Sequence, residues 1–235
     1  MSEYKVVIDD KENLETFEYI VDRTKTVDNI NTATYKGEDE VEYEFTPSEY
    51  TELKRIDLKF TKPQNLNFLN SLPSNLEILN VGANDLYGQT IPAITTTHSS
   101  LKILRLYNNG LDGELPDISK FSNLEEFSLG GQRWGTWTDS QNGWNKVLKD
   151  RHSVSSHPGQ FTLSTDFDVP STLKTVLLKY NSMNTDTING ILIALDNAGA
   201  SNGTLDIRGN QMATSTGTGT TAKGNLATKG WTILS

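Results

Sequence analysis

The sequence contains no cysteine, which excludes disulfide bonds, thiolate-bound zinc and cysteine nucleophiles. Basic residues are also scarce, because 21 lysines and arginines stand against 30 aspartates and glutamates, for a formal net charge of −9. Such a chain lacks the basic face that grips nucleic-acid phosphates. Its 235 residues, 35% of them hydrophobic, nevertheless suffice to enclose a core. Composition therefore removes several classes of function and selects none.

Long apolar runs are missing as well. The segment from Met1 to Asp10 has an apolar run of only three residues before two aspartates, whereas a signal peptide needs a basic start and a longer apolar stretch. The longest apolar run extends from Ile191 to Leu195, far short of the roughly 20 residues that cross a bilayer. We expect a chain that neither inserts into membranes nor uses an N-terminal signal peptide.

Enzyme signatures are absent or weak. The sequence has no phosphate-binding G-x-x-x-x-G-K-(S/T) loop and no H-E-x-x-H motif. His152 and His157 lie in a polar stretch, which favours a solvent-exposed pair over a metal site. Asp166 and Asp168 are a weak signal for calcium or for a hydrolase, because such pairs are common in loops. We therefore expect no catalytic residues, no metal and no cofactor.

One leucine pattern recurs along most of the chain. It reads L-x-x-L-x-L-x-x-N-x-L, and the copy from Leu101 to Leu111 fits it throughout. Further copies begin at Leu76, Leu124 and Leu173, and a degenerate one at Leu53; a second degenerate copy, from Leu205 to Met212, lacks the first leucine. The second apolar positions of the six copies (56, 79, 104, 127, 176 and 205) are separated by 23, 25, 23, 49 and 29 residues. Four of these steps are similar, and the remaining one, 49 residues, is close to twice the others, so the pattern is a genuine repeat.

The pattern has a physical explanation. Each copy supplies a short strand whose alternate apolar residues point into a core, and one copy can bury its apolar edge only by stacking on its neighbours. The asparagine that follows each strand can bond backbone groups that the turn leaves unpaired. We expect a ladder of four such residues: Asn84, Asn109, Asn181 and Asn210. Thr61 and Gln132 replace the asparagine in other copies, which predicts an irregular ladder there.

With these motifs the sequence resembles the leucine-rich repeat family over about residues 50–235. The stretch from Asn109 to Leu124 matches the family variant N-x-L-x-G-x-(I/L)-P. The resemblance implies an α/β solenoid, a right-handed superhelix of six or seven coils with short parallel strands on its concave face. The ending from Ile188 to Ile233 is similar to those that close repeat proteins of bacteria and of bacteriophage virions.

The sequence divides into two parts. Residues 1–48 lack the repeat and predict a strand-rich N-terminal cap, or alternatively a docking segment for a partner, with strands at Val6–Ile8 and Val41–Phe45. Residues 49–235 form the expected solenoid, with an insertion at about 134–170 and a C-terminal cap at about 213–235. Within that cap, the Thr-, Ser- and Gly-rich stretch 213–224 predicts a loop. A short helix over 222–229 and a final strand at Trp231 and Ile233 follow it.

The expected insertion holds three of the four tryptophans, Trp134, Trp137 and Trp144. Large aromatic side chains usually bury their area, so the three can pack as a small core of the insertion. Alternatively they form a binding platform, because exposed aromatics anchor interfaces and stack on sugar rings. A hidden coil at Phe161 and Leu163 is the less favoured reading of the double step.

The concave face offers a second candidate binding surface. Residues beside the inward-pointing leucines should project from it, and this pattern places Ile78 and Ile103 next to each other in the open. Arg105 and Tyr107 lie beside them on the same strand and its extension. Adjacent apolar, aromatic and arginine side chains are typical of interfaces.

Two classes of function fit these features. The favoured one is a non-enzymatic bacteriophage virion component, structural or host-attaching, which binds other virion proteins, a host surface protein or a glycan. The alternative is a bacterial leucine-rich repeat module that binds proteins in the cytoplasm or is delivered to a host, outside the cell, by a route that uses no N-terminal signal peptide. A carbohydrate-active protein is a distant third, suggested only by tryptophans near Asp166 and Asp168.

Overall fold

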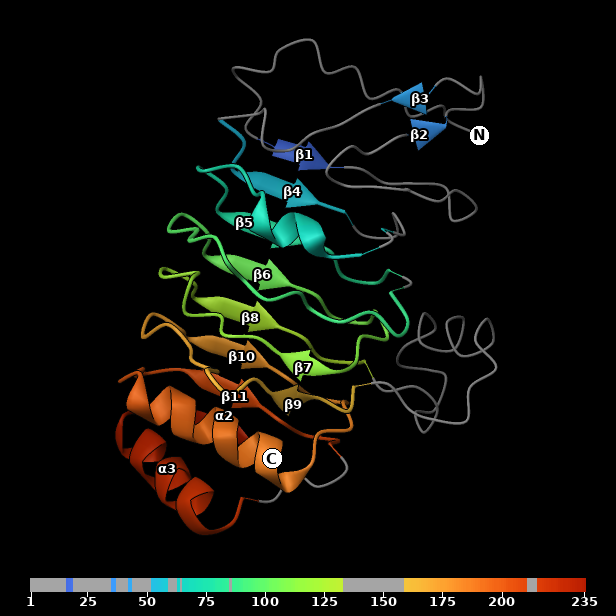
Figure 1. Cartoon of the computed structure of the whole chain (residues 1–235). Helices are drawn as coiled ribbons and strands as arrows, with labels where there is room; N and C mark the ends of the chain where they lie inside the picture. The colour runs from blue at the N-terminus through green and yellow to red at the C-terminus, as the bar shows by residue number, and fades with distance from the viewer. Residues whose placement is uncertain are drawn as a thin grey trace.

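A computed structural model of the chain describes residues 52–58, 63, 65–84, 86–132, 159–210 and 215–235, and the backbone of three short strands before residue 52. Eight short strands form one open sheet in which every neighbouring pair is parallel (Figure 1). In sheet order they are β1 (Thr16–Glu18), β4 (Arg55–Asp57), β5 (Ile78–Asn80), β6 (Ile103–Arg105), β8 (Glu126–Ser128), β10 (Thr175–Leu177), β11 (Thr204–Asp206) and β12 (Thr232–Leu234).

Each strand pairs with the next without a shift in register. The middle residue of one strand aligns with the middle residue of its neighbour, as Leu79 does with Leu104 and Val176 with Leu205. From β4 to β11 these middle side chains are buried, at 0–4% exposure. They are the second apolar positions of the six sequence copies, so the repeat predicts both the strands and their register. The predicted α/β class with short parallel strands is confirmed.

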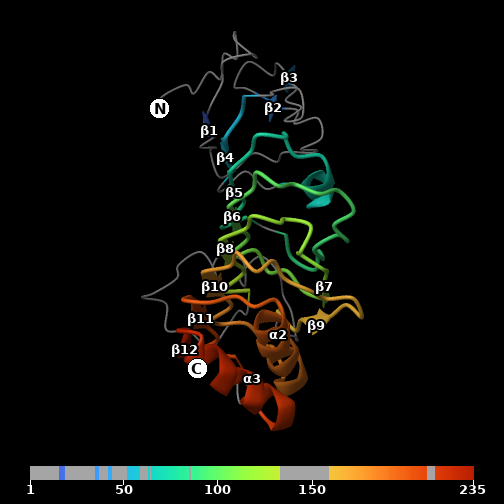
Figure 2. The same cartoon turned by 90° about the vertical axis from the view of Figure 1, so that its left-hand side faces the viewer.

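The described parts of the connections between β4 and β12 lie on one side of the sheet (Figure 2). Between β4 and β8 they are mostly extended, with one short 3-10 helix, η2 (Asn67–Asn70). Further along, β7 (Glu114–Leu115) pairs in parallel with β9 (Thr162–Leu163). The last two connections contain the helices α2 (Thr185–Asn197) and α3 (Gly217–Thr228). A separate antiparallel pair, β2 (Tyr35–Lys36) and β3 (Glu42–Tyr43), lies between β1 and β4 in the sequence.

A continuous apolar core fills the space between the sheet and these connections. The leucine that opens each copy is buried beside the strand residues: Leu53, Leu76, Leu101, Leu124 and Leu173 all have 0–1% exposure. Fully burying a leucine side chain stabilises the fold by roughly 1.5–3 kcal/mol. Because each copy contributes several such side chains and none can bury them alone, the stacking of copies is what stabilises the fold.

The expected asparagine ladder is present along the end of the sheet. Asn109 Nδ2 donates to the carbonyls of Leu106, at 2.9 Å, and of Val81 in the preceding copy, at 3.0 Å. Its Oδ1 accepts the Asn84 amide at 2.8 Å. Asn84, Asn181 and Asn210 make equivalent bonds, each spanning two copies.

The expected irregularity at Gln132 is wrong. Gln132 Nε2 donates to the carbonyls of Leu129 and Leu106, at 3.2 and 2.7 Å, and its Oε1 accepts the Asn109 amide at 2.9 Å. A glutamine has the same terminal amide as asparagine on a side chain one methylene longer, so it can serve the same partners. The ladder therefore runs unbroken from Asn84 to Asn210. Thr61 lies outside the described residues.

The residue before each ladder position has a left-handed backbone. The five positions, with φ between 56° and 76°, are Ala83, Asn108, Gly131, Tyr180 and Gly209. This conformation costs a non-glycine residue roughly 1–2 kcal/mol. Three of the five are not glycine, so the ladder bonds and core contacts around them must outweigh that cost.

The double step in the repeat contains a single connection. β8 pairs directly with β10, so no strand of the large sheet lies between Phe127 and Val176. After residue 132 the described chain resumes at Gly159, whose amide donates to the Leu111 carbonyl at 2.9 Å. The regular path is thus in place from Gly159 onward, within the range expected for the insertion. Phe161 is buried in the core and directly precedes β9.

The helices correct the sequence reading of the C-terminal part. The sequence predicts no helix over α2. It predicts a loop over 213–224 and a short helix over 222–229, whereas α3 already begins at Gly217 and ends at Thr228, so only its second half was predicted. Glycine and threonine are weak helix formers, but α3 packs along α2 and tertiary packing stabilises it. Gly219 lies so close to Asn189 of α2 that any side chain there would collide with it. The final strand is present as β12, with Trp231 buried before it.

The N-terminal segment contributes to the large sheet. The backbone of β1 pairs in parallel with β4 and extends the sheet by one strand. β3 falls within the strand expected at Val41–Phe45, whereas Val6–Ile8 lies outside the described residues. The role of residues 1–48 as a cap or as a docking segment remains a prediction.

Candidate binding face

The open face of the sheet is the side opposite the helices, and it carries the first and third residue of every strand. From β4 to β11 the first residues are Arg55, Ile78, Ile103, Glu126, Thr175 and Thr204, all half-buried. The third residues are Asp57, Asn80, Arg105, Ser128, Leu177 and Asp206. The face therefore mixes apolar, hydroxyl and charged side chains, and its contacts show which of them are available to a partner.

The four residues expected on this face lie together. Ile78 and Ile103 are register partners on β5 and β6, and Arg105 follows on β6. Tyr107 lies two residues beyond the end of β6. All four are half-buried rather than fully open, because neighbouring side chains on the face cover part of each. The sequence therefore locates the cluster but overstates its exposure.

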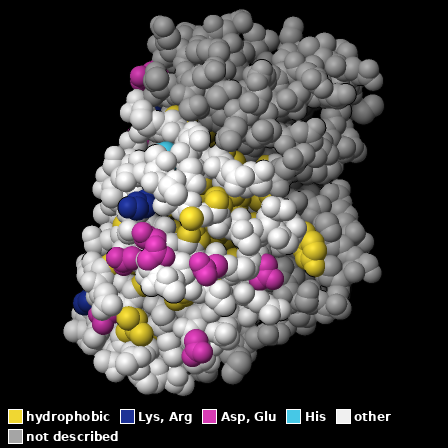
Figure 3. Space-filling model, in the orientation of Figure 1, with side chains coloured by type: hydrophobic (Ala, Val, Ile, Leu, Met, Phe, Trp, Pro, Cys, Tyr) yellow, Lys and Arg dark blue, Asp and Glu magenta, His cyan; other side chains and the backbone are white. Residues whose placement is uncertain are grey.

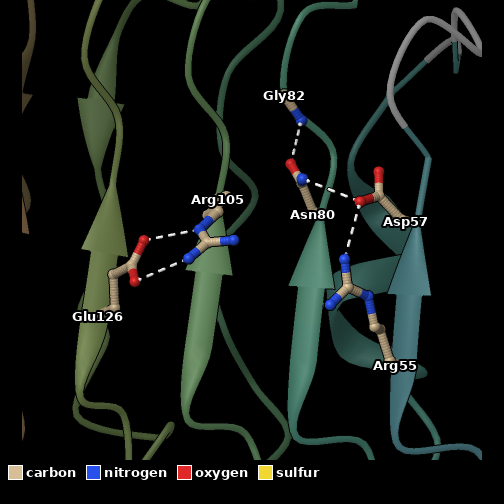
Figure 4. A network of polar contacts seen from close by, with 6 residues as sticks. All are labelled: Arg55, Asp57, Asn80, Gly82, Arg105 and Glu126. Atoms are coloured by element: carbon tan, nitrogen blue, oxygen red, sulfur yellow. Dashed lines mark hydrogen bonds and ion pairs between the residues drawn. The ribbon is translucent and has the colours of Figure 1, made fainter. Parts of the chain in front are cut away.

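Arg105 is paired within the face. Its Nε and Nη2 donate to the two carboxylate oxygens of Glu126 on β8, at 2.7 and 3.0 Å (Figure 4). This bidentate bond is the main reason that the pKa of Arg105 lies above its ordinary value. The geometry fixes the guanidinium beside Ile103 and leaves its remaining N–H groups for another acceptor.

A second polar network covers the start of the face. Asp57 Oδ2 accepts Asn80 Nδ2 at 3.2 Å and lies 3.4 Å from Arg55 Nη2 (Figure 4). Asn80 Oδ1 in turn accepts the Gly82 amide at 3.0 Å. Asp57 and Asn80 are buried, at 6% and 3% exposure. The network therefore ties the side chains of β4 and β5 to one another across the open face.

Tyr107 is held flat against the preceding copy. A Cβ placed on Gly82 would meet three atoms of the Tyr107 ring at nearly equal distances, so the ring covers that glycine with its face. Two further glycines lie against a large residue of a neighbouring copy: Gly130 against the backbone and Cγ of Lys179, and Gly209 against the ring of Tyr180. Lys179 Nζ is 5.7 Å from the centre of the Tyr180 ring, within reach of a cation–π interaction.

The sequence reading missed this second cluster, formed by Leu177, Lys179 and Tyr180. All three are half-buried. The sequence held a signal for it. When the copies are aligned, Gly82, Gly130 and Gly209 each match a large residue at the same position of a neighbouring copy, which indicates close packing of that residue on the glycine. Next to this cluster, Arg208 bonds Asp206 with two nitrogens, at 2.9 and 2.8 Å.

The other candidate residues fall elsewhere. Trp134, Trp137, Trp144, His152 and His157 lie outside the described residues. Asp166 and Asp168 are exposed on the side opposite the open face, where acidic side chains gather (Figure 3). The described ranges contain no group of three or more histidine, aspartate or glutamate side chains placed to hold a metal ion.

Comparison with known proteins returns no relative: no family model, curated protein or solved structure matches the chain. In the part of the chain that the structure describes, no helix has both the length and the apolar character to cross a membrane.

Proposed function

We propose that this chain is a leucine-rich repeat solenoid that acts as a non-enzymatic binding protein and docks a protein partner on its open face. The in-register strands, the ladder and the left-handed residue before each ladder position support a repeating coil. Each of these features recurs in successive copies at the same place, which is the behaviour of a solenoid built from equivalent units.

One observation carries the binding proposal. Ile78, Ile103 and Tyr107 are the half-buried apolar and aromatic residues of this part of the open face, which we call the apolar cluster. Ile78 and Ile103 are register partners, and Arg105, bonded to Glu126, stands between Ile103 and Tyr107 along the chain. Interfaces typically have an apolar centre and a polar rim, with tyrosine and arginine enriched among the anchors. The ring of Tyr107 rests on Gly82, so little side-chain entropy is lost when a partner covers it.

The virion is the proposed setting, on the basis of the C-terminal resemblance. A bacterial interaction module acting in the cell or delivered outside it would use the same face, so the setting needs its own test. Mass spectrometry of purified phage particles separates the two. A virion component co-purifies in fixed copy number, whereas an intracellular module is absent from particles.

The binding surface is tested by three variants measured in the same way. Ile103→Asp and Tyr107→Ala alter the apolar cluster, whereas Thr204→Ala changes a half-buried residue of the same face on β11 and serves as the control. We expect the first two to reduce incorporation into particles at least tenfold, since truncating an anchor costs about 2 kcal/mol or more. Melting temperatures within about 2 °C of the parent would show that folding is intact, and equal incorporation of all three variants would contradict the proposal.

The tryptophans offer a second surface for the same test. If Trp137 anchors a partner, Trp137→Ala weakens binding and leaves the melting temperature nearly unchanged. If Trp134, Trp137 and Trp144 form a small core, the same change lowers the melting temperature and leaves binding intact. A loss of stability alone would therefore remove them from the binding surface.

A further inference from the structure

His98 is buried where three successive copies meet, on the side of the molecule that carries the connections. The residue is 8% exposed. Its amide donates to the Lys120 carbonyl of the following copy at 3.0 Å, and its ring stacks on Phe121, with ring centres 6.0 Å apart. The ring also lies near the backbone of Leu69 in η2 of the preceding copy, which acts to raise the pKa of His98. One side chain thus touches both neighbours of its own copy.

The segment that leads to His98 is fastened to η2 by Asn70. Asn70 Oδ1 accepts the Thr95 amide at 2.7 Å, and Asn70 Nδ2 donates to the Ala93 carbonyl at 2.9 Å. The segment 93–98 therefore depends on Asn70 at one end and on His98 at the other. Both Asn70 bonds are exposed and can be exchanged for water, whereas the contacts of His98 are made inside the core.

The ring has no place for a second proton. His98 Nε2 is buried and has no hydrogen-bond partner in the described part of the chain. A protonated ring would place a charge and an unsatisfied N–H beside Phe121, which costs considerably more than burying the neutral ring. We propose that His98 is a proton-sensitive latch, which joins three copies while its ring is neutral and releases segment 93–98 when the ring is protonated.

The surrounding groups do not offset the charge. Asn67–Asn70 contains no ionisable residue, and the stretch 91–100 contains none besides His98. On the following copy, Lys120 is exposed, and Asp117 is half-buried and accepts the Ser119 amide. Burial is accordingly the main cause that lowers the pKa of His98, and the backbone of Leu69 opposes it only in part.

The direction of the effect follows from linkage. A histidine whose folded-state pKa is depressed stays neutral in the closed form, while the open form takes up a proton near its ordinary pKa. The closed form is therefore fully favoured above about pH 6.5 and loses stability as the pH falls below that value. At pH 5 the closed-to-open ratio can fall at most about thirty-fold, the limit set by an ordinary histidine pKa near 6.5.

Two measurements on the full chain test the latch. NMR titration follows the three histidine rings of the parent protein, and His98→Gln identifies the His98 signal by its loss. Hydrogen exchange of the His98 and Thr95 amides is measured at pH 7 and pH 5 and corrected for the intrinsic rates. We expect His98 to titrate below 6.5 and the protection of both amides to fall about ten- to thirty-fold at pH 5. The amides of Leu205 and Ile207, which lie far along the sheet, should keep their protection at pH 5.

The variant distinguishes this latch from general acid unfolding. In His98→Gln, or in His98→Phe should the first variant fold poorly, the acid-dependent loss at Thr95 should disappear. An ordinary titration near 6.5 with unchanged protection would overturn the proposal. An equal acid-dependent loss in the variant would also overturn it, because carboxylates would then be responsible. The latch does not depend on what the open face binds.

Discussion

Asn109→Ala tests the ladder most directly, because Asn109 is fully buried in the middle of it. The change removes two donated bonds and one accepted bond. Val81 O keeps the bond from Asn84 Nδ2, at 2.8 Å, and Leu106 O keeps that from Gln132 Nε2, at 2.7 Å. Each carbonyl is thus weakened but not orphaned. The Asn84 amide, in contrast, loses its Asn109 acceptor.

The bonds that Asn109→Ala removes set the expected loss of stability. A buried donor that loses its acceptor costs about 1–3 kcal/mol, and each of the two lost carbonyl bonds contributes about 0.5–1.5 kcal/mol. Side-chain removal leaves a small polar void, which a water molecule can fill only if it finds two or more partners there. We expect the free energy of unfolding to fall by about 3 kcal/mol, measured by urea denaturation followed by circular dichroism.

Asn210→Ala is the matched control. Asn210 makes the same two donated bonds, to Leu178 O and Ile207 O, and accepts the Met183 amide at 3.2 Å. It is only partly buried, so water can replace much of what is lost. We expect a cost of about 1 kcal/mol. Equal costs at both positions, or a cost below about 1 kcal/mol for Asn109→Ala, would refute the argument that burial makes the ladder strong.

Gly131→Ala and Gly88→Ala both place a methyl group at a positive φ, but only the methyl group at 131 also collides with a side chain, that of Asn108. In denaturant titrations we expect the free energy of unfolding to fall by about 1 kcal/mol for Gly88→Ala and by at least about 3 kcal/mol for Gly131→Ala. Asn184→Ala removes the cap of α2, where Oδ1 accepts the Thr187 amide at 2.9 Å, and should cost about 1 kcal/mol. Burial raises the pKa of Asp206, but the bonds from Arg208 outweigh it and hold that pKa below its ordinary value. Asp206 thus contributes stability that is present above its ordinary pKa and lost as the pH falls through the depressed one. Thermal melts between about pH 6 and about pH 2 should accordingly show a shallower acid loss for Asp206→Asn than for the parent.

The strands were predictable from the sequence because each is fixed locally. Leu79, Leu104 and Val176 recur at the same place in the pattern, and burial of every second residue leaves a short strand one way to face the core. The parallel order followed from the repeat, since equivalent units stack in chain order. Local pattern and tertiary fold agree in this part of the chain.

The helices depended on information that the repeat obscures. After the cap at Asn184, the apolar residues have the spacing of a helix face: Ile188, Ile191, Leu192 and Leu195. The leucine-rich repeat around them predicts strands, and it hides this helical spacing. The sequence predicts only the second half of α3, because the Thr-, Ser- and Gly-rich residues of the first half favour a loop, and packing against α2 stabilises the helix back to Gly217. No periodicity within one segment reveals such a contact.

The candidate site was predictable only in part. Alternation along β5 and β6 places Ile78 and Ile103 on the open face, and register makes them neighbours. The glycines under Tyr107 and Tyr180 are meaningful only once the copies are aligned in space. The pairing of Arg105 with Glu126, one strand away, likewise depends on side-chain geometry that the sequence does not contain.

The change from extended to helical connections has a consequence for curvature. Neighbouring strands lie about 4.8 Å apart, and the hydrogen-bonded strands β7 and β9 keep that spacing on the other side. Helices pack about 8–10 Å apart, so α2 and α3 need nearly twice the room behind β10, β11 and β12 (Figure 2). The sheet must therefore bend toward its open face over these last strands. A straight partner that lies across the row of strands would contact the early strands directly. The final strands, β10 to β12, would curve around the end of that partner.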